Sequence, residues 1–324
     1  MIKKNILINA GLIFISVIFL FLCLELCARA YYQLQGKVPF FALTTSGAQD
    51  ALLGWKGQET WGDTRSGKIK VFFVGDSFTY RDKDLKGRMY YDVVGQNIDI
   101  EPFVYGGGGY STLQEYLAID KYIDEIKPDL VVLQVCSNDF INNSWDLERR
   151  SYMHNNYTVR PYYESGKIKY RFPRGPVFLR QYLIPYSRLA YFFAVKIDRK
   201  LADLAGKGRL KTIENYIETG EAELKEFKRS ADTTEELIVM IRKRCGKTPI
   251  IAFSTFDDEP YSGRFKLIFR RLDIDFLTDI PKLAWDAERR GKVRNNDHWS
   301  EKGHAACGTY LAEYIRTNFL KDRQ

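Results

Sequence analysis

The sequence predicts an α/β protein: a three-layer sandwich with a parallel sheet, preceded by one N-terminal transmembrane helix. Continuous apolar runs at 70–74, 130–135 and 249–253, with a further strand-like segment at 102–105, are typical of strands buried on both faces of a parallel sheet. Between them, apolar residues recur at spacings of three and four across 113–126, which predicts a helix. Alternating strands and helices favour the layered α/β arrangement.

The N-terminus carries the strongest compositional signal. The pair Lys3-Lys4 precedes an apolar run over 6–24, close to the roughly twenty residues needed to cross a bilayer. Basic residues ahead of the first apolar run keep the N-terminus in the cytoplasm, so the folded part is expected outside the membrane. The tripeptide Ala28-Arg29-Ala30 is similar to a signal-peptidase site, but the length of the run favours a retained signal-anchor over a cleaved signal peptide. We therefore expect a single-pass protein of the cell inner membrane, with its large domain on the periplasmic or extracellular side.

Three segments are expected along the chain. Residues 1–30 form the signal-anchor or signal peptide, 31–68 a polar tether that leads into the fold, and 69–324 one large domain. Within that domain a stretch at about 141–210, dense in Tyr, Arg and Asn, interrupts the alternation and is interpreted as an insertion over one edge of the sheet. Long excursions of this kind are usually lids or binding loops, and a surface subdomain packed by its own aromatic side chains is an equal alternative.

The composition excludes several classes of protein. With 45% hydrophobic and 15% aromatic residues in a chain of 324, the protein is not disordered. The net charge of +8 comes from Lys and Arg scattered among acids, without basic runs, so we expect no nucleic-acid partner. The three cysteines beyond the apolar run and its flank, Cys136, Cys245 and Cys307, have no metal-binding spacing, and we expect neither a metal nor another cofactor.

A serine follows the first buried strand. Gly75-Asp76-Ser77 comes directly after the run at 70–74, at the carboxyl end of a strand, where parallel α/β sheets bind their ligands. A serine in that position can act as a nucleophile if a base lies in reach. Taken alone, the motif is equally consistent with a serine that begins a helix or a turn.

The next two strands are also followed by residues suited to binding an oxygen atom. Gly106-Gly107-Gly108-Gly109 would let a backbone N–H approach a ligand oxygen closely, although a flexible turn has the same composition. Asn138, after the run at 130–135, could donate its amide to a developing oxyanion or cap the following turn.

Three histidines are candidates for a base. His298 lies in the polar loop 295–300, just before a final helix that Ser300 is expected to cap, and a base there could face the edge of the sheet. His304 falls on that helix, which favours a structural role. His154 lies in the insertion, where a surface position is expected.

Together these segments resemble the four sequence blocks of the SGNH/GDSL hydrolase superfamily, in which Ser, Gly, Asn and His follow in this order. The matching residues are Ser77, Gly109, Asn138 and His298, and the likeness to exported, membrane-anchored members extends over nearly the whole part outside the membrane. The resemblance implies a flavodoxin-like sandwich in which Ser77 attacks an ester carbonyl and His298 removes its proton. It also implies an oxyanion hole made by the backbone N–H groups of Ser77 and Gly109 and the side chain of Asn138.

The chain departs from this superfamily where the third member of a catalytic triad is expected. An acid generally lies two or three residues before the histidine, where this chain has Asn296 and Asn295. Asp297 is adjacent to His298 and completes a triad only if the loop bends its carboxylate toward the ring. Otherwise an asparagine or a backbone carbonyl orients the imidazole, and catalysis is expected to be weaker.

The resemblance implies a serine esterase that acts outside the cytoplasmic membrane on an acylated glycan or lipid, through an acyl-enzyme on Ser77. An O-acyltransferase in exopolysaccharide or cell-wall glycan modification would use the same acyl-enzyme and is an alternative. A catalytically idle glycan-binding protein of the same fold is a third hypothesis, which the two asparagines before His298 favour slightly.

Overall fold

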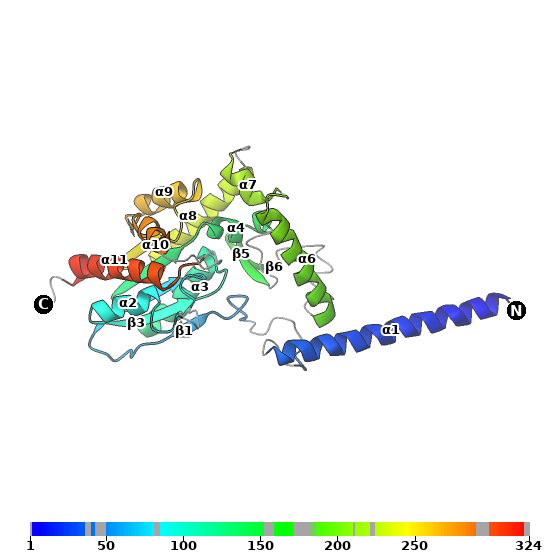
Figure 1. Cartoon of the computed structure of the whole chain (residues 1–324). Coiled ribbons are helices and arrows are strands. Elements are labelled where there is room, and N and C mark those ends of the chain that lie inside the picture. Colours follow the sequence, from blue (N-terminus) through cyan, green and yellow to red (C-terminus); the bar gives the residue numbers. More distant parts are fainter. Residues whose placement is uncertain are drawn as a thin grey trace.

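The fold is described from a computed structural model of the chain (Figure 1). It describes residues 2–35, 40–42, 50–80, 85–151, 159–171, 183–184, 186–209, 211–220, 224–289 and 298–320. Along the chain the helices and strands are α1 (Ile2–Leu34), β1 (Gln58–Thr60), β2 (Ile69–Gly75), α2 (Tyr90–Asn97), β3 (Ile100–Gly106), α3 (Thr112–Ile126), β4 (Leu130–Val135), α4 (Asn138–Asn142), α5 (Trp145–Glu148), β5 (Arg160–Glu164), β6 (Lys167–Arg171), α6 (Arg188–Gly206), α7 (Ile213–Glu218), α8 (Lys225–Cys245), β7 (Ile250–Ser254), α9 (Tyr261–Arg271), β8 (Asp275–Phe276), α10 (Ile280–Arg289) and α11 (Glu301–Phe319).

The central sheet has the strand order β1-β3-β2-β4-β7-β8. Neighbouring strands from β3 to β8 run parallel, whereas β1 pairs antiparallel with β3. The predicted α/β class is therefore confirmed, with a sheet that is mixed at one edge instead of parallel throughout. Strand β1 arises from the segment interpreted as a tether, and its 3 residues are too few to show a pattern in the sequence.

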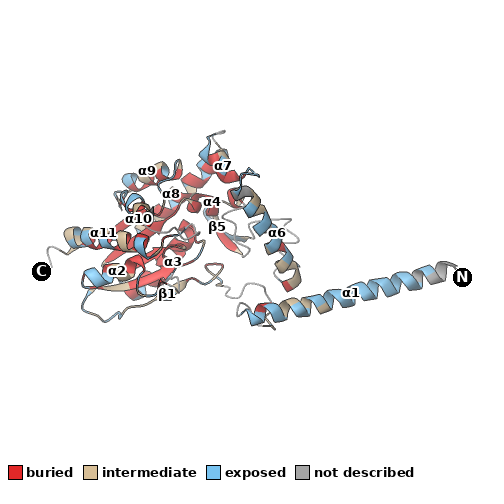
Figure 2. Ribbon diagram, in the orientation of Figure 1, coloured by how far each residue is buried: buried red, intermediate tan, exposed pale blue. Residues whose placement is uncertain are grey.

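Helices cover both faces of the sheet (Figures 1 and 2). Along β2, Val71 and Phe73 pack with residues of α2, α10 and α11, whereas Phe72 and Val74 pack with residues of α3, α8 and α9. Side chains alternate between the faces of a strand, and all four of these are fully buried. This burial on both faces explains why the central strands are continuous apolar runs in the sequence.

Strand β2 lies between β3 and β4, so the chain crosses from one side of it to the other. The carboxyl ends of the three strands are level, because Gly75 pairs with Gly106 and Val74 pairs with Leu133. Such a change of direction leaves a crevice at the carboxyl ends of the strands, where open α/β sheets bind ligands. The loops that follow β2, β3 and β4 therefore meet at one edge of the sheet.

Helix α1 projects from the sandwich (Figure 1). Its segment Ile8–Leu34, 27 residues long, is long and apolar enough to cross a membrane, and most of it is exposed (Figure 2). Near its C-terminal end, Glu25 accepts hydrogen bonds from the backbone N–H groups of Arg188 and Leu189, each at 3.0 Å. Helix α6 therefore begins against α1.

The region predicted as an insertion contains α5, the hairpin β5–β6 and α6 among its described residues. The hairpin is a separate two-stranded sheet. Strand β5 is mostly buried and β6 is mostly exposed, so the hairpin packs on the sandwich through β5.

Candidate active site

A tight turn after β2 presents Ser77, which is partly exposed. The carboxylate of Asp76 accepts a hydrogen bond from the backbone N–H of Phe78 at 2.9 Å. The backbone N–H of Asp76 donates to Gln134 Oε1 at 3.1 Å, which ties the turn to the end of β4. A Cβ at Gly75 would lie 2.4 Å from Gln134 Oε1 and 2.9 Å from Gln134 Cβ, so a larger residue there would displace the side chain that holds the turn. The turn that carries Ser77 is thus held at both ends.

The structure brings His298 to Ser77 across 221 positions of sequence, with 2.7 Å between Nε2 and Oγ. The imidazole stacks on the ring of Phe78 at 4.7 Å between centroids, and Trp299 packs edge-on against the same ring. For His298 to accept the proton of Ser77, its Nε2 must be unprotonated and the ring hydrogen must lie on Nδ1. The distance is within the hydrogen-bond reach that a nucleophile and its base require.

A carboxylate from α10 holds the segment that follows His298. Glu288 Oε1 accepts hydrogen bonds from the backbone N–H groups of Ser300 at 2.6 Å and Gly303 at 3.0 Å. These N–H groups lie at the N-terminus of α11, where donors lack helical partners and a negative charge is favourable. Sequence reasoning missed Glu288, because no spacing pattern relates a residue of α10 to the loop of the histidine.

The glycine-rich loop after β3 runs beside the turn of Ser77. The N–H of Gly107 donates to the carbonyl of Gly75 at 3.3 Å. Gly106 approaches the turn so closely that a Cβ would lie 2.6 Å from the backbone of Thr79. Gly109 has φ of 70°, in the left-handed region that favours glycine. The residue predicted to donate to an oxyanion therefore belongs to a loop in backbone contact with the turn of Ser77.

Asn138 begins α4 at the carboxyl end of β4 and is 8% exposed. Its Nδ2 donates to Asn142 Oδ1 at 2.8 Å and lies 3.5 Å from the carbonyl oxygen of Tyr110, the residue after Gly109. The structure therefore gathers Asn138, the glycine-rich loop and the turn of Ser77 at the same edge of the sheet.

Several predicted positions lie outside the described residues: Asn295, Asn296, Asp297 and His154. A third member of a triad thus stays a prediction. The remaining histidine, His304, is buried on α11, where its Nδ1 accepts a hydrogen bond from the N–H of Tyr90 at 3.4 Å and its ring packs against Trp299.

Three acidic side chains are buried around the site: Asp76, Glu115 and Asp139. Burial raises the pKa of Asp76, and the hydrogen bond that its carboxylate accepts from the backbone N–H of Phe78 opposes that rise. Burial raises the pKa of Glu115 well above its ordinary value, and the charges of Asp139 and Asp76 raise it further. Burial and the charge of Asp76 likewise raise the pKa of Asp139 well above its ordinary value. This cluster therefore retains protons at a higher pH than exposed carboxyl groups do.

The sequence also missed two side chains that contact the glycine-rich loop. The indole Nε1–H of Trp55 donates to the carbonyl of Gly108 at 3.2 Å, and Arg160 Nη2 donates to the carbonyl of Gly109 at 2.8 Å. Trp55 precedes β1 in the segment interpreted as a tether, and Arg160 begins β5 in the predicted insertion. An isolated tryptophan or arginine in a polar stretch gives no local pattern that could have identified either contact.

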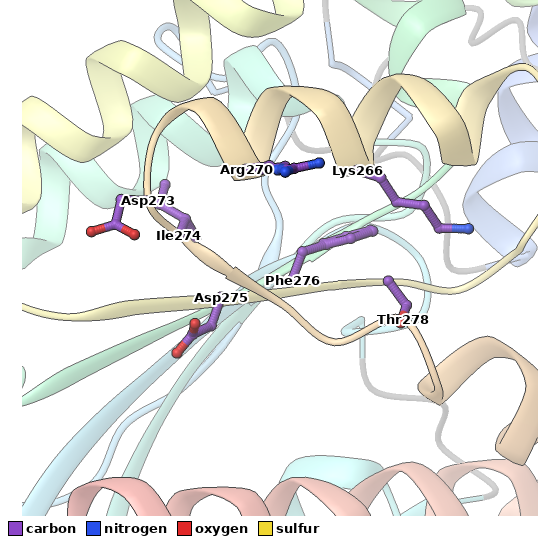
Figure 3. A pocket seen from close by; sticks show the side chains of 7 residues that line it. All are labelled: Lys266, Arg270, Asp273, Ile274, Asp275, Phe276 and Thr278. Atoms are coloured by element: carbon purple, nitrogen blue, oxygen red, sulfur yellow. The ribbon is translucent and has the colours of Figure 1, made fainter.

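A surface pocket lies at the β8 edge of the sheet (Figure 3). Its lining comes from α9, β8 and the residues beside them: Lys266, Arg270, Asp273, Ile274, Asp275, Phe276 and Thr278. Strands β4 and β7 separate β8 from β2, so this pocket is not part of the arrangement around Ser77. Among the described residues, no cluster of three or more His, Cys, Asp or Glu side chains has the geometry to hold a metal ion.

Comparison with known families agrees with this arrangement. Residues 71–173 match the family described as GDSL-like lipase/acylhydrolase. The resemblance predicted from the sequence is thereby confirmed, and with it the class of enzyme, a hydrolase acting on ester bonds. No curated protein matches the sequence.

Three similar solved structures have low sequence identity to this chain. A member of the lipolytic G-D-S-L family from Veillonella parvula is 13% identical, covers 78% of this chain and 99% of its own, and has a TM-score of 0.42. A catalytic mutant of an acetylxylan esterase from Geobacillus stearothermophilus is 15% identical, covers 77% of this chain and 94% of its own, and has a TM-score of 0.40. A putative acylhydrolase from Bacteroides fragilis is 12% identical, covers 80% of this chain and 90% of its own, and has a TM-score of 0.39.

Proposed function

We propose that this member of the GDSL-like lipase/acylhydrolase family is a serine esterase that acts outside the cytoplasmic membrane on an acylated glycan or lipid. The observation that carries the proposal is the 2.7 Å distance between His298 Nε2 and Ser77 Oγ. A hydroxyl within hydrogen-bond reach of an imidazole is the arrangement that activates a serine. The pair lies where the loops after β2, β3 and β4 meet, the usual place for a ligand in such a sheet.

In the proposed reaction Ser77 Oγ bonds to the ester carbonyl carbon while its proton passes to His298 Nε2. The N–H groups of Ser77 and Gly109 and the amide of Asn138 stabilise the oxyanion that forms. Collapse of the intermediate breaks the bond to the alkoxy leaving group, which takes the proton from His298. Water then attacks the acyl-enzyme and gives a proton to His298, and a second collapse releases the acid and returns that proton to Ser77.

The contacts of Asn138 are compatible with this role. One amide hydrogen is committed to Asn142 Oδ1 at 2.8 Å, while the contact to the carbonyl of Tyr110 is long, at 3.5 Å. A contact of that length is weak, so a substrate oxyanion could replace it at little cost. Asn142 then keeps the amide oriented.

Helix α1 is proposed to be a retained anchor. The apolar run of 19 residues over 6–24 would span about 28 Å as a helix, close to the thickness of the hydrocarbon core, and would leave Glu25 and Arg29 near the outer surface. The helix continues through 28–30, and Arg29 Nη1 donates to the carbonyl of Phe40 at 3.0 Å. Cleavage there would remove these contacts, so the mature protein should keep its first thirty or so residues. Mass measurement of the mature protein tests this, and a chain that begins near Tyr31 would contradict it.

The catalytic proposal is tested by labelling the full-length protein in detergent with a fluorophosphonate probe. We expect modification at Ser77, none in Ser77→Ala, and a loss of at least about a thousandfold in labelling rate in His298→Ala. Ser66→Ala, in an exposed loop, serves as the matched control and should label like the wild type. Folded wild-type protein that does not label would favour the idle binding protein instead.

Hydrolysis and transfer are separated by following the acyl group. With p-nitrophenyl acetate as donor, the proposed esterase releases acetate at a rate that an added oligosaccharide does not change. Acetyl groups that accumulate on the oligosaccharide would assign the same acyl-enzyme to an O-acyltransferase.

A further inference from the structure

Two side chains outside the motifs hold the loop that carries Gly109. We infer that Trp55 and Arg160 are positioning residues that fix the two peptide groups on either side of Gly109, and so aim its N–H at the substrate oxygen. The inference rests on the proposed function, since it concerns the donor that would hold the oxyanion. Neither side chain is placed in contact with the substrate.

Trp55 acts on the peptide group between Gly108 and Gly109. Its Nε1–H donates to the carbonyl of Gly108 at 3.2 Å. A peptide group is planar and trans, so this carbonyl and the N–H of Gly109 point in opposite directions within one rigid unit. A hydrogen bond on the carbonyl therefore sets the direction of the N–H.

Arg160 acts on the next peptide group. Its Nη2 donates to the carbonyl of Gly109 at 2.8 Å, and the N–H of Tyr110 on the same peptide donates to the carbonyl of Gly107 at 2.9 Å. With a run of glycines there are no side chains to limit rotation, and a loop of this composition readily changes its backbone conformation. External hydrogen bonds on both peptide groups remove that freedom.

The two holding groups are themselves fixed. The side chain of Arg160 is fully buried, with Nε 2.8 Å from Glu148 Oε2 and Nη1 donating to Gln114 Oε1 at 2.6 Å. Its guanidinium lies 4.7 Å from the centre of the Trp55 ring, so the two groups also hold each other. The phenolic hydroxyl of Tyr110 donates to the carbonyl of Trp55 at 2.8 Å.

Close backbone packing brings the two segments together. Gly54, with φ of 85°, approaches Val159 so closely that a Cβ would lie 2.2 Å from the carbonyl oxygen of Val159. Trp55 and Arg160 are the residues that follow each of these. A larger side chain at Gly54 would separate the start of β5 from the segment before β1 and draw both groups off the loop.

A buried arginine paired with a carboxylate is seldom more stable than well-packed apolar residues, because both charges lose their hydration. The fixed geometry of the guanidinium gives it another use, because several N–H groups can hold several acceptors in a set arrangement. At Arg160 these acceptors are Gln114 Oε1 and the carbonyl of Gly109, while Glu148 forms an ion pair with the guanidinium. The arrangement is therefore suited to preorganising the loop before substrate binds.

The test uses Trp55→Phe in the full-length protein. Phenylalanine keeps a ring against Arg160 and Tyr110 but has no N–H for the carbonyl of Gly108. Removal of one oxyanion donor typically lowers kcat by about a hundredfold to a thousandfold, so a displaced donor should lower it by roughly tenfold to a hundredfold. We expect that fall in kcat for p-nitrophenyl acetate, with KM within about twofold, because the donor acts mainly in the transition state.

Trp61→Phe is the matched control. Trp61 packs against Tyr122 and Phe72 in the core, so its replacement changes packing without touching the loop. It should leave kcat and KM unchanged while the melting temperature falls. Equal falls in kcat for both tryptophan variants would overturn the inference, since they would show a general loss of packing.

Arg160→Lys provides the second variant, because it keeps a cation near Glu148 and loses the donor to Gly109. It should also lower kcat with little change in KM. A folded Trp55→Phe or Arg160→Lys protein with wild-type kcat would overturn the inference while labelling of Ser77 still supports the proposed function. Wild-type labelling in Ser77→Ala would instead reject the proposed function itself.

Discussion

The insertion meets the rest of the molecule through a carboxylate and an arginine at two places that differ in burial. At the first place Arg160 of β5 pairs with Glu148 of α5, both side chains are 0% exposed, and Arg160 also donates to the glycine-rich loop. At Arg29 and Glu25 the side chains are 20% and 12% exposed, and they join α1 to the start of α6. The first pair is part of the core around the site, whereas the second lies at the edge of the molecule.

The comparison teaches that the same chemistry has different consequences in the two places. A buried charge that loses its partner cannot be hydrated, so the cost of disturbing Arg160 falls on the stability of the whole domain. Water can replace the partners of Glu25, so the cost there is confined to the start of α6. The loop of Gly109 is thus held rigidly, while α6 is held by contacts that respond to local change.

The largest effect is expected from Glu148→Ala. This change leaves Arg160 buried beside no carboxylate and removes the acceptor of the Tyr162 hydroxyl. The free energy of unfolding should fall by about 3–5 kcal/mol, measured by urea denaturation. The control Glu236→Ala removes an exposed carboxylate that accepts from Tyr163, and should cost less than about 1 kcal/mol. Similar costs for the two would show that burial does not distinguish these sites.

Glu115 is a buried carboxyl group that, unlike Glu148, has no arginine paired with it among the described residues. Among the described residues neither oxygen of Glu115 has a hydrogen-bond partner, and burial raises its pKa well above the ordinary value of 4.5. Above pH 4.5 the unfolded chain releases this proton while the folded protein keeps it, so stability falls as pH rises toward the folded pKa. Glu115→Gln should make this fall between pH 5 and 8 shallower, as measured by urea denaturation. An unchanged slope would show that Glu115 is ionised in the folded protein.

A smaller effect is expected from Glu25→Gln at the edge of the molecule. The carboxylate accepts from the Ser187 hydroxyl at 2.9 Å and from the N–H groups that begin α6. Loss of its charge should weaken this cap by about 1 kcal/mol, seen as faster hydrogen exchange at Arg188 and Leu189. Global stability should change little. Unchanged exchange at these two amides would mean that other contacts hold α6.

A change in ionic strength should have the smallest effect of these tests. It should affect the start of α6 more than the loop of Gly109. Between 0.1 and 1 M NaCl the screening length falls from about 10 Å to about 3 Å. Exchange at the start of α6 should rise by no more than a few fold, and kcat should stay within about twofold because Arg160 is inaccessible to salt. If added salt lowered kcat as steeply as it lowered the protection of the α6 amides from exchange, the buried pair at Arg160 would be no better shielded from salt than Glu25 is.

Much of the fold follows from local pattern. The apolar runs predicted at 70–74, 130–135 and 249–253 form β2, β4 and β7 within one residue at each end, and the helix predicted across 113–126 forms α3. Ser300 caps α11 as expected, accepting from the N–H of Lys302. Strand β8 has only 2 residues and, like β1, is too short to be recognised from alternating apolar and polar residues. Ser77, Gly109 and Asn138 each follow a predicted strand, and parallel strands present their carboxyl ends at one edge of a sheet. The sequence therefore predicted that these three residues would lie close together.

The sequence by itself determined which segments are buried, because strands covered on both faces are continuous apolar runs and a helix covered on one face has apolar residues spaced by three and four. Which distant groups meet was decided only in the tertiary structure. Trp55 reaches Gly108 across 53 positions, Arg160 reaches Gly109 across 51, and His298 reaches Ser77 across 221. Such contacts leave no periodic trace, because each depends on the order of strands in the sheet and on the paths of loops between them. Short-range pattern therefore specifies what is buried, and the packing of the whole chain specifies against what.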